Sequence, residues 1–132
     1  MFFSCNKEKI CNEISAGEYE GWFTNSKTSK THYNSILYLT VADENTIIIN
    51  TTGKINSQSA HVQINDCHVE GNVGAMIGAQ SKNLKIDGKI RRNIKGDYII
   101  EGRYKYFENS GGLGNPNSSY YEIHGIFKIK SK

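Results

Sequence analysis

The sequence contains little proline, leucine and alanine. Among its 132 residues there are one Pro, four Leu and five Ala. Leucine and alanine are among the best helix formers, so their scarcity argues against a helical bundle. No apolar run approaches the roughly 20 residues of a membrane-spanning helix. The net charge is only +3. Basic residues are spread from Lys7 to Lys132 without a polybasic arm, so no nucleic-acid partner is predicted.

The residues that are abundant favour strands. The chain has 17 Ile, 8 Tyr, 5 Phe and 13 Gly, and β-branched and aromatic side chains suit a pleated sheet. Apolar and polar residues alternate between turn-forming clusters, which predicts a single all-β domain built as an antiparallel up-and-down meander of about eight strands. We expect the strands near 17–24, 34–42, 45–51, 59–65, 67–73, 83–91, 97–107 and 120–130, with a helical turn at 75–80.

A weak repeat places a glycine in the middle of five predicted strands. Each copy reads apolar, polar, Gly, any residue, apolar, and the five glycines are Gly21, Gly71, Gly88, Gly102 and Gly125. Strand side chains alternate between two faces, so each glycine falls on the apolar face. Inner glycines act as kinks where a sheet curls strongly, and the repeat therefore predicts that the meander closes into a small β-barrel.

Charge also favours one register for two of these strands. Pairing Gly88 with Gly102 places Asp87 opposite Arg103, whereas a shift by two residues would set two acids against each other. In the hairpin nearer the N-terminus, a two-residue turn is expected at Asn65–Asp66, because both residues favour turns. Both pairings keep the apolar residues of each strand on one face.

A set of aromatic residues is expected to line the interior of the predicted barrel. It comprises Tyr19, Phe23, Tyr38, Tyr98, Tyr104, Tyr106 and Phe127. Such a face forms either a packed core or the wall of an apolar cavity, whose phenol hydroxyls would orient a bound ligand. The polar loops 25–33 and 108–118 are expected to frame one end, where a cavity mouth and contact residues usually lie.

No motif in the sequence indicates an enzyme, a cofactor or a metal site. His61, His68 and Glu70 fall on one polar face, but a surface His–Glu pair explains them better than a zinc site. The glycines at 111–114 precede a strand, whereas a phosphate-binding loop follows a strand and precedes a helix. No nucleophile motif or hydrolytic triad can be assembled. We therefore expect a protein that is not an enzyme and holds no cofactor.

The first residues, Met1–Cys5, resemble the end of a bacterial lipoprotein signal peptide. The resemblance implies that Cys5 is the lipid attachment site, that residues 1–16 are a signal-peptide remnant and polar tether, and that 17–132 form the barrel domain. A charged n-region and most of the apolar h-region are missing, so it implies an upstream or trimmed start. In an oxidising envelope, Cys11 and Cys67 could form a disulfide. The alternative is a cytoplasmic protein with three reduced thiols.

The segment Gly17–Gly21, which opens the predicted meander, makes the chain similar to small lipocalin-like or calycin-like lipoproteins of Bacteroidetes-type bacteria. This resemblance implies a lipocalin-like barrel in the cell envelope that is anchored to the membrane through Cys5. It also implies a non-enzymatic protein that binds a small apolar ligand in the barrel lumen. The alternative function is a protein–protein interaction module, such as an inhibitor of an envelope hydrolase or an immunity protein, which uses its loops while side chains fill the lumen.

Overall fold

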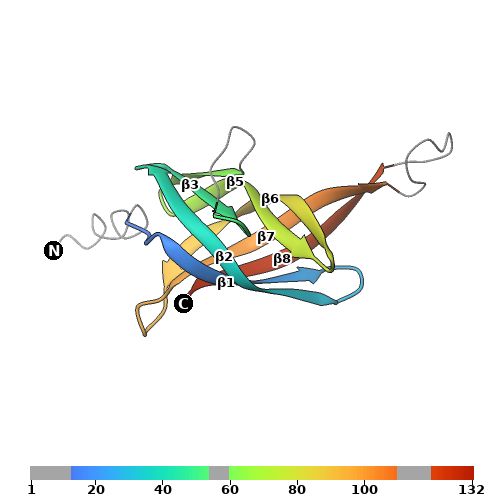
Figure 1. Ribbon diagram of the computed structural model, residues 1–132, viewed down its shortest axis with the longest axis horizontal. Coiled ribbons are helices and arrows are strands. Elements are labelled where there is room, and N and C mark those ends of the chain that lie inside the picture. Colours follow the sequence, from blue (N-terminus) through green and yellow to red (C-terminus); the bar gives the residue numbers. More distant parts are fainter. Residues whose placement is uncertain (1–12, 54–59, 110–119) are drawn as a thin grey trace.

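A computed structural model describes residues 13–53, 60–109 and 120–132, and the described residues form eight antiparallel strands. The strands are β1 (Gly17–Asn25), β2 (Thr31–Asp43), β3 (Thr46–Asn50), β4 (His61–Asn65), β5 (His68–Ile77), β6 (Gln80–Arg92), β7 (Tyr98–Asn109) and β8 (Tyr120–Ser131). Each strand pairs with the next, and β1 also pairs with β8, so the meander closes into a ring (Figure 1). The predicted all-β, eight-stranded meander and its closure are confirmed.

The segment expected to form a helical turn is instead the end of a hairpin. β5 continues to Ile77, which pairs with Gln80 of β6, and the two residues between them form the turn. Gly78 adopts a positive φ of 66° there, which glycine tolerates without steric cost. The helical-turn prediction was wrong because pairing with β6 satisfies the backbone groups of this segment.

The β4–β5 turn lies one residue later than predicted. Asn65 pairs with His68, which leaves Asp66 and Cys67 as the two turn residues, with φ values of 51° and 67°. Two consecutive positive φ values are those of a type I′ turn, whose twist matches that of the flanking strands. The resulting two-residue shift of register leaves each side chain on its predicted face, and Val69 still points inward.

The predicted glycine pairing is confirmed in the β6–β7 hairpin. Gly88 lies opposite Gly102, and Asp87 lies opposite Arg103. A Cβ added to Gly88 would lie 2.3 Å from the Glu101 carbonyl oxygen, and one added to Gly102 would lie 2.1 Å from that of Asp87. The two backbones therefore approach more closely than any side chain permits, as expected for kinks in a strongly curled sheet.

The end of the ring at which the chain enters β1 is covered by the preceding residues. Ile14 is buried in the core. Two tyrosines on the inside of the ring hold this segment through their hydroxyls: Tyr19 donates to the Ser15 carbonyl at 2.7 Å, and Tyr98 donates to the Glu13 carbonyl at 3.1 Å. These bonds satisfy phenol groups that burial would otherwise leave without a partner.

A polar clamp joins two strands that are not neighbours in the ring. The buried Asn34 of β2 donates its amide to the Met76 carbonyl of β5 at 3.0 Å and accepts a bond from the Met76 N–H at 2.8 Å. Farther along, the Gly78 N–H donates to His32 Nδ1 at 3.0 Å. β3 and β4 are only five residues long, so β2 and β5 meet beyond them. The ring is consequently pinched at this level.

Candidate functional site

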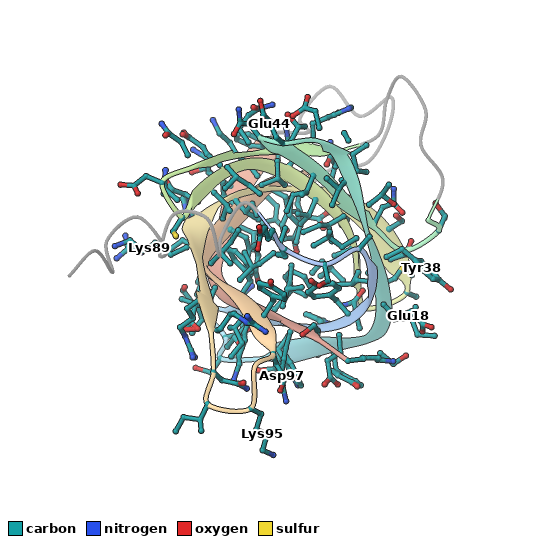
Figure 2. All side chains as sticks on the ribbon, turned by 90° about the vertical axis from the view of Figure 1, so that its left-hand side faces the viewer. Glu18, Tyr38, Glu44, Lys89, Lys95 and Asp97 are labelled. Atoms are coloured by element: carbon teal, nitrogen blue, oxygen red, sulfur yellow. The ribbon has the colours of Figure 1, made fainter. Side chains whose placement is uncertain are left out.

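The structure places six of the seven predicted ligand-binding residues inside the ring. Tyr19, Phe23, Tyr98, Tyr104, Tyr106 and Phe127 are each at most 8% exposed. Tyr38 is the exception. Its neighbours Leu37 and Leu39 are buried while it is half-buried, and it lies on the outer side of β2, where Figure 2 labels it. Its ring lies against Gly53, so Tyr38 does not line the interior.

The interior aromatic side chains pack against one another. The Phe23 ring meets the Tyr104 ring edge to face at 5.9 Å and stacks on Phe127 at 6.4 Å, while Tyr104 stacks on Tyr106 at 6.2 Å. Gly125 makes room for Tyr104, because a Cβ there would lie 2.4 Å from the tyrosine ring. The same arrangement, with an aromatic ring covering a cross-strand glycine, supports strongly bent sheets.

The described interior is a filled core. A cavity large enough for a ligand would leave accessible area on the side chains that line it, yet Phe23, Leu37 and Ile100 are 0% exposed. Figure 2 looks along the ring and shows its interior occupied by side chains. Burial raises the pKa of Tyr104 to about 12, as expected for a phenol enclosed among apolar side chains.

The outer side of the ring carries a group of side chains that we call the aromatic–basic face: the half-buried Trp22 of β1, and the exposed Tyr33 of β2, Arg103 of β7, and Ile126 and Lys128 of β8. These residues are adjacent because Trp22 pairs with both Tyr33 and Lys128, and Arg103 pairs with Ile126. Tyr33 is 54% exposed and Ile126 is 59% exposed. Trp, Tyr and Arg are the residue types that contribute most to binding energy at protein interfaces.

Contacts within this face hold its aromatic side chains in place. The Trp22 and Tyr33 rings lie 5.4 Å apart with an interplanar angle of 38°, and the Lys128 ammonium lies 5.9 Å from the Trp22 ring centre. The Tyr33 hydroxyl donates to Glu20 Oε1 at 2.6 Å. This hydrogen bond to Glu20 is the main reason that the pKa of Tyr33 is raised. The rings are ordered before any partner arrives, which lowers the entropy lost on binding.

Three grooves on the outer side of β5–β8 meet at Arg103. The largest, of about 570 Å³, lies over the Gly88–Gly102 pair. A second groove of about 360 Å³ includes Lys85 and His124 together with the acids Glu70 and Asp87. A third groove, of about 310 Å³, includes Ile126. Arg103 lines all three. The kinked hairpin therefore presents one guanidinium in a hollowed part of the surface, beside the exposed Ile126.

The acids on the outer side of β6–β8 bind bases other than Arg103. Asp87 lies 2.7 Å from His68, Glu101 lies 3.0 Å from Arg91, and Glu122 lies 2.6 Å from His124. Although the Asp87–Arg103 register is confirmed, the ion pair that it favoured is not the one formed. Among the residues that the structure describes, Arg103 and Lys85 have no ion pair. Their positive charges remain available to a ligand.

The aromatic–basic face was not predicted from the sequence, although the alternation of residues in β1 already indicated part of it. Tyr19 and Phe23 were expected inside, and Trp22 lies next to Phe23, so period-two alternation already placed the single tryptophan outside. An outward tryptophan is unusual enough to mark a contact surface. The neighbours of Trp22 on β2 and β8 could not be identified, because alternation along β1 does not determine its register with those two strands.

The cysteine predictions fall largely outside the described residues. Cys5 and Cys11 lie there, and so does most of the loop 108–118. Cys67 is disulfide-bonded and buried at the β4–β5 turn, at the end of the ring where the chain enters β1. The pairing of Cys11 with Cys67 stays a prediction.

The described residues contain no cluster that could hold a metal ion. No three His, Cys, Asp or Glu side chains gather in them, and His68 instead pairs with Asp87 across the β5–β6 hairpin. Within the same ranges, no helix is long and apolar enough to cross a membrane.

Comparison of the chain with protein-family models, curated proteins and solved structures found no match. The geometry alone therefore carries the functional argument.

Proposed function

We propose that this protein is a non-enzymatic interaction module that binds a partner protein through the aromatic–basic face. The observation that carries the proposal is the set of exposed Tyr33 and Ile126 with the half-buried Trp22, which lies against the Tyr33 ring and Lys128. Arg103 lies beside Ile126. Large exposed apolar side chains with a charged rim are typical of protein-binding surfaces. The sheet face thus takes the role that the sequence analysis gave to the loops.

The filled interior favours one of the two functions considered from the sequence. An apolar ligand in the lumen needs a void, and the aromatic side chains expected to bind it instead contact one another. The interior of a closed ring of eight strands can be filled by side chains or can hold one small ligand. Here β2 and β5 also meet beyond the short strands β3 and β4, which narrows the ring. Protein binding is therefore favoured over an apolar ligand.

We further propose that the module works in the cell envelope as a lipocalin-like lipoprotein anchored through Cys5. The disulfide at Cys67 supports an oxidising compartment. Tyr19 and Tyr98 fasten Ser15 and Glu13, ten and eight residues after Cys5, to one end of the ring. That end would face the membrane. The protein isolated from its native host should begin at Cys5 and carry acyl mass, and an unmodified cytoplasmic species starting at Met1 would contradict the anchor.

Site-specific photocrosslinking in the native host tests the binding proposal. A photoreactive amino acid at Ile126 should give one discrete adduct with a partner protein, and Trp22→Ser in the same chain should abolish that adduct. The matched control places the amino acid at Glu44, an exposed residue in the β2–β3 turn, at the end of the ring that faces the viewer in Figure 2 and away from Ile126. Equal adducts from both positions, or an adduct insensitive to Trp22→Ser in a folded protein, would refute the proposal.

A further inference from the structure

We infer that the grooves at Arg103 are a receptor for side-chain carboxylates, so that the partner presents an acidic segment to this part of the surface. The inference rests on the proposed function and adds the chemistry of the partner. Arginine presents a planar fork of N–H donors that matches a carboxylate with two parallel hydrogen bonds. Its position where three grooves meet lets a partner side chain approach the fork.

The distribution of charge supports an acidic partner. Seven bases lie on the outer side of β6, β7 and β8, namely Lys85, Lys89, Arg91, Arg103, Lys105, Lys128 and Lys130, against three acids, Asp87, Glu101 and Glu122. This excess of four charges exceeds the net charge of +3 of the whole chain. The positive charge of the protein is thus concentrated on one side, which would steer and orient a negatively charged partner surface.

The pairing of those three acids leaves Arg103 available. Each acid is held by a different base, as described above, and Arg103 itself makes no ion pair among the described residues. A carboxylate from a partner would therefore not have to displace an internal one. It would replace only water around the guanidinium, and such charge-assisted hydrogen bonds are among the stronger polar contacts.

The same surface fits a peptide better than a nucleic acid. Asp87, Glu101 and Glu122 interrupt the bases and would repel a continuous phosphate backbone, whereas carboxylates on a peptide are spaced and can avoid them. Ile126 lies directly beside Arg103 and offers an apolar contact. The interior rings of Tyr104 and Tyr106 are not available for stacking on bases.

A capped decapeptide of glutamates is the probe. When ¹⁵N-labelled protein is titrated with it, the backbone amides of Lys85, Arg103 and Ile126 should shift and saturate, and decaglutamine should leave them unchanged. Arg103→Gln should weaken binding about tenfold or more, which is the loss expected for a bidentate charged contact. The matched control is Lys95→Gln, which removes the same charge from the exposed β6–β7 turn, at the end of the ring that faces the viewer in Figure 2, and should weaken binding less than twofold.

Further variants distinguish the contribution of the planar guanidinium to binding from the contribution of its positive charge, and both from an effect on folding. Arg103→Lys keeps the charge and loses the planar fork, so its affinity should fall between those of the native protein and Arg103→Gln. Arg103 is exposed, so all these variants should keep the native melting temperature. Equal weakening by Arg103→Gln and Lys95→Gln, or tighter binding of decathymidylate or inorganic phosphate than of decaglutamate, would overturn the inference.

The crosslinking experiment shows which proposal has failed. If the adduct from Ile126 still depends on Trp22 but persists in Arg103→Gln, the carboxylate receptor is refuted and the binding face stands. If the adduct depends on neither residue, the proposed function itself is refuted. Loss of the adduct in both Trp22→Ser and Arg103→Gln, with Lys95→Gln unaffected, supports both.

Discussion

Replacing Tyr104 by alanine tests whether the interior is a core or a binding cavity. The Tyr104 side chain is 3% exposed and contacts the rings of Phe23 and Tyr106. It also fills the space over Gly125, which has no side chain of its own. Truncation would therefore leave a void that neither neighbouring strand can close easily, because the backbones of β7 and β8 are paired on both sides of it.

The expected cost follows from large-to-small substitutions in packed cores. Removing a buried aromatic ring destabilises a protein by about 3 to 5 kcal/mol, out of a total of about 5 to 15 kcal/mol for a domain of this kind. For 132 residues this corresponds to a fall in melting temperature on the order of 10 to 18 °C. Tyr104→Ala should therefore remain folded at 25 °C unless the native protein is at the least stable end of that range.

The assay is urea unfolding followed by circular dichroism, with Tyr104→Phe as the matched control. Phenylalanine keeps the ring and removes a hydroxyl that has no hydrogen bond among the described residues, so it should cost less than about 1 kcal/mol. If Tyr104→Ala also lost less than about 1 kcal/mol, the side chain would line a void and our account of the interior would be wrong. Loss of an apolar probe from an otherwise stable Tyr104→Ala protein would then favour the ligand-binding alternative.

The other predictions concern the ring and the face. Gly102→Ala should destabilise the protein by more than about 2 kcal/mol in the same urea assay, because its Cβ would lie 2.1 Å from a backbone oxygen. Asn34→Leu should cost about 2 to 4 kcal/mol and speed hydrogen exchange at the Met76 amide, since both backbone groups of Met76 lose their partner. Glu20→Gln should lower the raised pKa of Tyr33 towards its ordinary value, as measured by a spectroscopic titration of the phenol. An unchanged value would contradict the hydrogen bond.

The pattern of the sequence was sufficient to predict the strands and one of their registers. Period-two alternation identifies which residues face inward, and it depends only on local backbone geometry. The Gly88–Gly102 pairing was predictable because the glycine repeat and the charges on both sides of it favour the same register. The β4–β5 turn was placed one residue early, because turn propensity favoured Asn65–Asp66, whereas strand twist selected positive φ values at Asp66 and Cys67.

The tertiary structure alone decided how the interior is packed and which outer side chains form ion pairs. Whether an aromatic face is a core or a cavity depends on how tightly the ring closes, and the Asn34 clamp between β2 and β5 is a contact between residues 42 positions apart. The choice of ion-pair partners is equally non-local. Asp87 of β6 forms an ion pair with His68 of β5, although Arg103 of β7 lies opposite it. This choice exists because every strand of the closed ring has two neighbours.

The aromatic–basic face shows the same division. Alternation along β1 determines that Trp22 points outward. Closure of the ring then brings β8 beside β1 and places Lys128 over Trp22, more than a hundred residues away in the chain. The sequence by itself determined which side chains each strand presents to solvent, because that follows from local geometry. Only the closed ring decided which of those side chains become neighbours, because that depends on the register of strands far apart in the chain.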